Sequence, residues 1–250
     1  MGSEIVVLLD WDTDFFGFPV AQIAKNRLSP NERDYVDEFC RENKVRLLQF
    51  KCDAHHRPSV LAAEEYDFHL ADVRMSYRRK LDVRSLERPN SPEGVLFRRA
   101  NKDDVSILMD ITTGLFTHSR YFFDANFPRD RVKEFYRSWI EKAVHGESDD
   151  LAWVISNSLL PQGFCSIAYC DERQARIGLV GINPSVMGQG LGGLLMSNVL
   201  VSLVEHGVEE VSVVTQGRNY GAQRLYQRAG FLIDQIEIYY HRWFDNTNGK

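Results

Sequence analysis

The chain reads Val180-Gly181-Ile182-Asn183-Pro184-Ser185-Val186-Met187-Gly188-Gln189-Gly190-Leu191-Gly192-Gly193-Leu194-Leu195 at the point that decides its fold. This pattern predicts an apolar strand, a glycine-rich turn and the start of a helix. The first turn of a helix carries unpaired N–H groups and a partial positive charge, and glycines let a phosphate approach that backbone closely. The segment therefore predicts a phosphate or pyrophosphate site. It lacks the Lys-Ser/Thr ending of a nucleotide P-loop, and its late position argues against a dinucleotide fold.

A second segment narrows the chemistry. After a predicted strand at residues 211–215, the chain continues Gln216-Gly217-Arg218-Asn219-Tyr220-Gly221-Ala222-Gln223-Arg224-Leu225-Tyr226-Gln227-Arg228-Ala229-Gly230-Phe231. This run resembles the Asn-x-x-Ala-x-x-x-Tyr-x-x-x-Gly-Phe pattern of the GCN5-related N-acetyltransferase (GNAT) family. The glycine-rich segment resembles that family's acetyl-CoA loop, Arg/Gln-x-x-Gly-x-Gly/Ala, with Met187 where the family usually has Arg or Gln. The resemblance covers residues 95–243.

The resemblance implies acetyl-CoA as co-substrate and gives each part of that molecule a site. The main chain of Val180 and Ile182 would pair with the pantetheine arm. The backbone of the loop, from Met187 at its corner onward, would hold the pyrophosphate through the amides of Gly188, Gln189, Gly190, Leu191, Gly192 and Gly193. On the following helix, Asn219 and Ala222 would contact the cofactor, and Tyr226 would point at the thioester sulfur.

Tyr226 is the predicted catalytic residue. An uncharged amine attacks the thioester carbonyl, and a thiolate leaves. A tyrosine hydroxyl with a reference pKa of about 10 stays protonated at neutral pH and can donate to that sulfur. The general base is left open, because the predicted strand at residues 176–181 carries no carboxylate. The candidates are His118, Asp124, His145 and ordered water.

The acceptor side is predicted at residues 116–128, where Arg120 would pair with a phosphate, Tyr121 would stack on a ring and Asp124 would orient a hydroxyl or amine. This region and the chain's ending resemble the TDP-fucosamine acetyltransferase branch, whose acceptor is a nucleotide-linked amino-deoxysugar. Three functions are kept apart: N-acetylation of such a sugar, N-acetylation of another amine in a metabolite, antibiotic or protein, and acyl-CoA binding without catalysis.

The domain organisation follows from a polar stretch with two prolines and a glycine at residues 82–94. It predicts a linker between an N-terminal α/β domain, residues 1–81, and an acetyltransferase domain, residues 95–250. Alternating strands and helices indicate an α/β or α+β fold. The resemblance implies a mixed, mostly antiparallel central sheet flanked by helices.

The N-terminal part contains two ambiguous features. Residues 61–68 align without gaps on residues 224–231, with Ala63 at the position of Tyr226, and a long strand follows each. Either this part is a reduced version of the C-terminal fold or the likeness is chance. Residues 11–20 are rich in aromatics, which would pack a sheet edge or contribute to the ligand pocket. A helix is predicted at residues 59–66, with Ser59 as its N-cap.

Composition excludes several classes of function. The net charge is −5 without a long basic run, which argues against nucleic acid as a partner. No apolar run reaches the roughly 18–20 residues that span a bilayer, so no membrane partner is expected. The four cysteines have neither metal-ligand nor paired spacing, which predicts no metal site and free thiols in the cytoplasm. The expected partner is a small-molecule amine, and a homodimer is left open.

Overall fold

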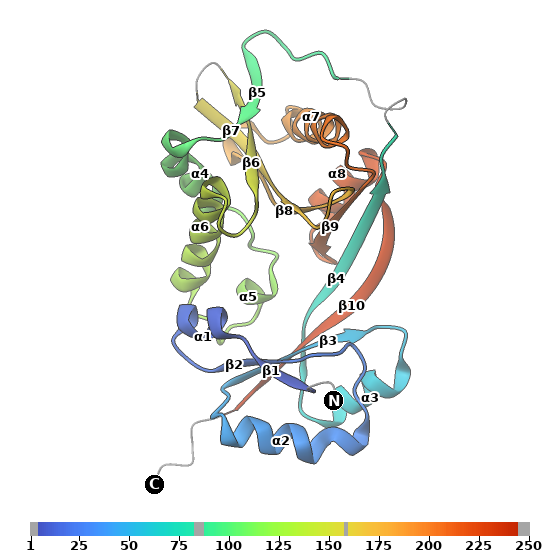
Figure 1. The fold of residues 1–250 in the computed structure, drawn as a ribbon. Coiled ribbons are helices and arrows are strands. Elements are labelled where there is room, and N and C mark those ends of the chain that lie inside the picture. The colour runs from blue at the N-terminus through green and yellow to red at the C-terminus, as the bar shows by residue number, and fades with distance from the viewer. Residues whose placement is uncertain (1–4, 83–87, 158–159, 245–250) are drawn as a thin grey trace.

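The computed structural model describes residues 5–82, 88–157 and 160–244. Ten strands form one sheet in the order β1-β2-β3-β10-β4-β9-β8-β7-β6-β5 (Figure 1). The strands are β1 (Val6–Leu8), β2 (Val20–Ile23), β3 (Leu47–Asp53), β4 (His69–Lys80), β5 (Val95–Arg99), β6 (Leu151–Asn157), β7 (Leu160–Tyr169), β8 (Gln174–Ile182), β9 (Glu210–Gln216) and β10 (Leu232–Trp243). Only β2–β3 and β8–β9 pair in parallel among the described strands, so the prediction of a mixed, mostly antiparallel sheet is confirmed.

Helices cover both faces of the sheet. They are α1 (Asp10–Phe16), α2 (Arg33–Glu42), α3 (Arg57–Glu65), α4 (Val105–Thr112), α5 (Arg120–Phe123), α6 (Arg129–His145), α7 (Leu191–Glu205) and α8 (Tyr220–Arg228). Successive strand residues point to opposite faces, so neighbours Val154 and Ile155 enter different cores. Val154 packs on the α4–α6 side, and Ile155 packs on the α7–α8 side. None of the helices in the described ranges is long and apolar enough to cross a membrane.

The sheet continues through both predicted domains. β4, from the N-terminal part, lies between β9 and β10, and β10 in turn pairs with β3. In Figure 1, β4 and β10 form the long curved ribbon that joins the two halves. The division into two domains stays a prediction, and residues 83–87 of the predicted linker lie outside the described residues. In the structure, β4 of the N-terminal part pairs with β9 of the C-terminal part, and β10 of the C-terminal part pairs with β3 of the N-terminal part.

The sequence likeness between the two parts extends to their local structure. β3 and α3 have the same lengths as β9 and α8, which begin 163 positions later (47 to 210, 57 to 220). Both helices end in the same way. After α3, Asp67 has a φ of 57° and the Phe68 amide donates to the Ala63 carbonyl at 3.1 Å. After α8, Gly230 has a φ of 77° and the Phe231 amide donates to the Tyr226 carbonyl at 3.0 Å. The two parts thus share one strand–helix unit with the same helix-end geometry.

The N-terminal part lacks the open glycine-rich loop of its counterpart. Ser59 is not an N-cap, because α3 begins two residues earlier with His56 in that position. Instead, the Ser59 hydroxyl accepts a hydrogen bond from the Leu28 amide at 2.8 Å and donates to the Leu28 carbonyl at 3.1 Å. Leu28 is buried. The loop that corresponds to the glycine-rich segment is thus tied down onto α3.

Candidate active site

A cavity of about 1060 Å³ opens where β8 and β9 separate. It reaches both faces of the sheet, because its walls include residues of α8 on one side and of α1, α5 and α6 on the other. Most of the predicted cofactor residues line it: Val180, Ile182, Met187, Gly188, Leu191, Gly192, Asn219, Ala222 and Tyr226. Gln189, Gly190 and Gly193 belong to the same loop but do not line the cavity.

The opening between the strands has a local cause. β8 pairs with β9 only from Gln174 to Ile177. At the next residues, Gly178 and Leu179 of β8 lie opposite the single residue Ser166 of β7, which is a β-bulge. The Ser166 hydroxyl accepts from the Leu179 amide at 2.8 Å and donates to Asp149 Oδ2 at 2.5 Å. Beyond the bulge, β8 keeps its pairing with β7 and leaves its other edge facing the cavity.

The glycine-rich loop presents backbone donors at that edge. Gly188 and Gly190 have φ of 82° and 83°, which a residue with a side chain rarely adopts. α7 begins directly after Gly190. The Leu194 amide makes the first helical hydrogen bond of α7, to the Gly190 carbonyl at 3.1 Å. The amides of residues 191–193 precede it and have no helical acceptor. Such a helix start favours a negatively charged group.

Tyr226 reaches the cavity from α8. Asn219 caps this helix by accepting the Ala222 amide at 3.1 Å, so its carbonyl oxygen orients the helix as well as lining the cavity. The Tyr226 ring lies 5.9 Å from the rings of both Tyr77 and Phe231. Burial raises the pKa of Tyr226 above its ordinary value. The hydroxyl therefore stays protonated at every ordinary assay pH and can act as a hydrogen-bond donor.

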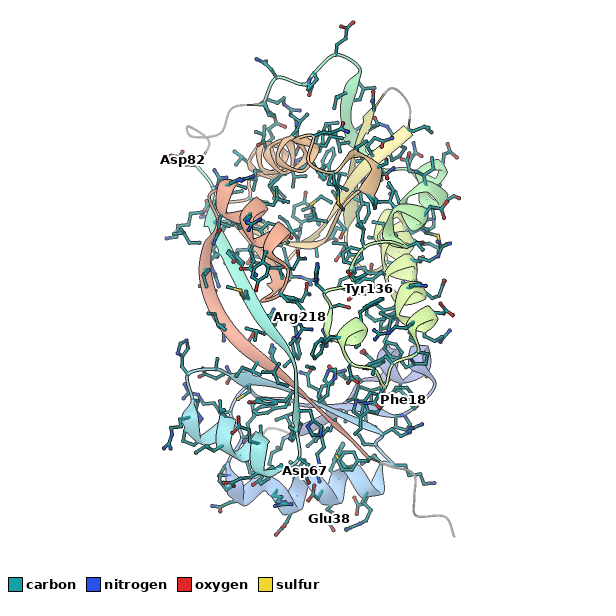
Figure 2. The ribbon with its side chains drawn as sticks, turned by 180° about the vertical axis from the view of Figure 1, so that it is seen from behind. Phe18, Glu38, Asp67, Asp82, Tyr136 and Arg218 are labelled. Atoms are coloured by element: carbon teal, nitrogen blue, oxygen red, sulfur yellow. The ribbon has the colours of Figure 1, made fainter. Side chains whose placement is uncertain are left out.

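Arg120 forms the centre of the opposite wall. Its guanidinium lies between two tyrosine rings, 4.1 Å from the centroid of Tyr121 and 4.3 Å from that of Tyr239. It donates to the Tyr121 hydroxyl at 2.6 Å, and that hydroxyl donates to Asp12 at 2.9 Å. Trp11, Asp12 and Tyr136 also line this wall, so the aromatic segment at residues 11–20 contributes to the pocket. Figure 2 labels Tyr136 on the α6 side and Arg218 on the α8 side.

The stacking role predicted for Tyr121 is wrong. The ring is buried against Phe16, Phe127 and Phe135 at centroid distances of 5.4, 5.1 and 4.9 Å, with Arg120 over it. These contacts leave no room for a ligand ring. Tyr121 lines the cavity, and its hydroxyl positions Arg120 and Asp12 through hydrogen bonds.

Asp124 does not line the cavity. Its Oδ2 accepts hydrogen bonds from His241 Nδ1 at 2.7 Å and Trp243 Nε1 at 2.8 Å, at the end of β10. Burial alone would raise the pKa of Asp124, but these two donors lower it to about 2. Burial also lowers the pKa of His241. The structure therefore assigns Asp124 to holding β10 against the α5 region, in place of the predicted contact with substrate.

The low pKa of Asp124 gives a stability prediction. Because its folded pKa lies below the unfolded value near 3.9, the carboxylate stabilises the fold above pH 4, and this contribution disappears as pH falls through about 2. We expect Asp124→Asn to lower the free energy of unfolding by about 2 kcal/mol at pH 7 and by much less near pH 2. Urea denaturation across this pH range measures the difference. An equal loss at both pH values would contradict it.

The structure brings a different set of candidate general bases to the cavity. Of the predicted candidates, His118 lines the cavity, whereas Asp124 and His145 do not. Two carboxylates that the sequence did not suggest, Asp72 and Asp149, are buried and line the cavity. Asp72 was missed because it comes from β4 of the N-terminal part. Asp149 lies in the α6–β6 turn, where the sequence has no recognisable motif.

Comparison with known proteins agrees with this geometry. Residues 114–231 match the model of the acetyltransferase (GNAT) family. The chain is 26% identical over 140 residues to the spore coat polysaccharide biosynthesis protein SpsD of Bacillus subtilis, covering 56% of this chain and 48% of that protein. It is 28% identical over 144 residues to the dTDP-fucosamine acetyltransferase of Escherichia coli, covering 57% of this chain and 61% of that enzyme. The chain thus spans about half the length of these curated relatives.

A solved structure has the same fold. The GCN5-related N-acetyltransferase from Sphaerobacter thermophilus superposes with a TM-score of 0.66 at 16% identity, over 95% of this chain and 76% of that one. At this identity, the likeness shows the fold alone. The family match adds the glycine-rich loop and the tyrosine helix, both of which lie inside its bounds. Residues 114–231, a little under half of the chain, are thus similar to the GNAT family of acetyltransferases, and the chain has the fold of a solved GNAT structure.

Proposed function

We propose that this protein transfers the acetyl group of acetyl-CoA to the amino group of a nucleotide-linked amino-deoxysugar. The observation that carries the proposal is the cavity through the opened sheet. On one side it holds the free amides of the α7 start and the hydroxyl of Tyr226, and on the other side it holds a polar pocket. A pyrophosphate fits the helix start, and the pantetheine arm would add to the open edge of β8 as a strand does.

The polar pocket suits an anionic acceptor. Arg120 and Lys142 line it, and neither makes an ion pair with a carboxylate in the described part of the chain. The Arg120 Nε is buried without a hydrogen-bond partner there. A diphosphate would supply acceptors for such donors. Asp12, whose carboxylate accepts from Tyr121, provides a partner for a sugar hydroxyl. The named activity of the Escherichia coli relative, dTDP-fucosamine acetylation, supports the same class of acceptor.

An acceptor screen tests the proposal. The purified protein is incubated with acetyl-CoA and, in turn, a dTDP-linked 4-amino sugar, free glucosamine, a polyamine and a lysine peptide. Free CoA thiol and acetylated product are then measured. We expect turnover with the nucleotide sugar and at least tenfold less with the free amino sugar, because the latter lacks the diphosphate. Acetylation of only the peptide or polyamine would favour the other amine classes. CoA binding without any turnover would favour the non-catalytic function.

The donor site yields a prediction at Gly190. A Cβ at this residue meets nothing within 4 Å, so the cost of Gly190→Ala arises from its left-handed φ of 83°. We expect acetyl-CoA affinity to fall about tenfold as the loop relaxes and turns its amides away. Gly207→Ala is the matched control, since Gly207 has φ of 84° and equally open space at the far end of α7. Calorimetric titration should show weaker binding in the first variant only. Equal affinity in both variants would argue against the loop as the pyrophosphate site.

A further inference from the structure

Asp72 is a buried carboxylate that the N-terminal part contributes to the cavity. The residue is 3% exposed. Its Oδ1 accepts the Val73 amide at 2.9 Å and lies 3.8 Å from Arg218 Nη2. Arg218 is fixed in turn, because it donates to the Ala71 carbonyl at 2.9 Å and packs on the Phe123 ring at 3.8 Å. The second oxygen of Asp72 accepts no hydrogen bond within residues 5–82, 88–157 and 160–244.

The strand register places Asp72 across the sheet from Tyr226. Side chains alternate along β4 after residue 71, so Asp72 and Arg74 share one face and Val73 and Tyr77 the other. Tyr77 packs beside Tyr226, whereas Tyr239, opposite Asp72 in register, stacks on Arg120. Both Asp72 and Tyr226 line the same cavity. A thioester in the gap would therefore have the tyrosine on one side and the carboxylate on the other.

β4 is also anchored at the motif that carries Tyr226. The Val73 carbonyl accepts the Gly217 amide at 2.6 Å, and a Cβ on Gly217 would lie 3.0 Å from Val73. Gly217 lies two residues before Asn219, which caps the tyrosine helix. Asp72 and Tyr226 are thus linked through the Val73–Gly217 hydrogen bond and the segment that leads into α8. This anchoring fixes the position of β4, which carries Asp72, relative to the start of α8.

We propose that Asp72 is the general base of the reaction, an inference that rests on the proposed acetyl transfer. The amine nitrogen attacks the thioester carbonyl and forms the C–N bond. Asp72 accepts one proton from that nitrogen. The C–S bond breaks, and the Tyr226 hydroxyl gives its proton to the leaving sulfur. The products are the amide and the CoA thiol. The proton on Asp72 returns to the Tyr226 oxygen through water, which restores both residues.

The surroundings of Asp72 suit this role. Burial raises the pKa of Asp72 to about 6, while Arg218, the Val73 amide and Arg120 oppose the rise. Besides Arg120 and Tyr226, the other titratable or charged side chains that line the cavity are Asp12, Arg74, His118, Tyr121, Tyr136, Lys142, Glu147, Asp149, Arg176 and Tyr239. A base whose pKa lies near the working pH combines ionisation with useful basicity. Asp149 differs, since its Oδ2 accepts from Trp139 and Ser166 and its Oδ1 lies 3.6 Å from Arg176, so it serves to hold the bulge.

The test compares Asp72→Asn with wild type across pH. Because Asp72 must be ionised, wild-type kcat/KM should rise as pH increases through about 6. In Asp72→Asn, kcat/KM at pH 7 should fall about 100-fold and this limb should disappear, with acetyl-CoA affinity kept within about twofold. Asp72→Glu should keep the limb. Asp130→Asn, on α6 with a 96% exposed side chain, is the control for a lost charge. A retained limb in Asp72→Asn, with or without a loss of rate, would overturn the role.

The test of Asp72 as general base does not depend on which amine is the acceptor. Each comparison uses the amine that the wild type acetylates best in the screen. If that amine is not a nucleotide sugar, the proposed acceptor fails and the comparison at Asp72 still decides about the base. If no amine is acetylated, both proposals fail. Thermal unfolding and acetyl-CoA titration of Asp72→Asn show whether the variant is folded. If it is not, the pH profile of Asp72→Glu decides, and loss of its acidic limb overturns the role.

Discussion

Replacing Tyr226 with phenylalanine is expected to lower kcat about 1,000-fold and to leave acetyl-CoA affinity within about twofold. The substitution removes only the hydroxyl. The ring contacts with Tyr77 and Phe231, at 5.9 Å each, remain. Since burial raises the pKa of Tyr226, the residue donates to sulfur only as negative charge develops there. The contribution is thus made in the transition state, which affects kcat and not ground-state binding.

The control for this variant lies on the same helix. Tyr220 is 65% exposed and does not line the cavity, so Tyr220→Phe should leave kcat unchanged. Stopped-flow or steady-state assays of CoA thiol release, together with calorimetric titration of acetyl-CoA, provide the two quantities. A parallel loss of kcat and of acetyl-CoA affinity would make Tyr226 a binding residue. Unchanged kcat would remove it from the mechanism.

Replacing Gly178 with alanine is expected to cost about 3 kcal/mol of unfolding free energy and to abolish measurable acetyl-CoA binding. A Cβ at this residue would lie 2.3 Å from Asp149 Oδ2 and 2.7 Å from the Ser166 hydroxyl. These two groups hold the bulge that separates β8 from β9, so relieving the clash would displace it. The gap that receives the pantetheine arm would change with the bulge.

A second glycine distinguishes this clash from a general effect of adding a methyl group. A Cβ on Gly114 would be 3.7 Å from Pro184, which is ordinary contact. The free energy of unfolding of Gly114→Ala should therefore lie within about 0.5 kcal/mol of the wild-type value. Urea denaturation of both variants measures the difference. Wild-type stability and wild-type acetyl-CoA affinity in Gly178→Ala would show that the bulge does not form the donor site.

The donor half of the site could be predicted from sequence because its signals are local. A glycine-rich helix start and a tyrosine helix each occupy one short segment, and both elements form where the pattern places them. The acceptor half could not be predicted, because it is assembled from distant segments. Tyr121 is enclosed by Phe16 from another part of the chain, and Asp124 is bound by His241 and Trp243. Contacts between residues so far apart in the sequence leave no local sequence pattern.

The N-terminal part resembles the C-terminal part but lacks its donor-site residues. Its helix carries Ala63 where the C-terminal helix carries Tyr226, and Leu28 is tied to Ser59 in the loop that corresponds to the glycine-rich one. Taken alone, it lacks the features of a donor site. Its long strand β4 nevertheless pairs with β9 and brings Asp72 to the cavity. The N-terminal part thus supplies one wall of the cavity and the proposed general base.

A crystal structure with bound CoA is the decisive measurement for the donor site. We expect the pyrophosphate on the amides at the start of α7, the pantetheine arm along the open edge of β8, and the sulfur within hydrogen-bond distance of the Tyr226 hydroxyl. Electron density that places the CoA thiol elsewhere, or that leaves the gap between β8 and β9 closed with CoA bound outside it, would overturn this assignment.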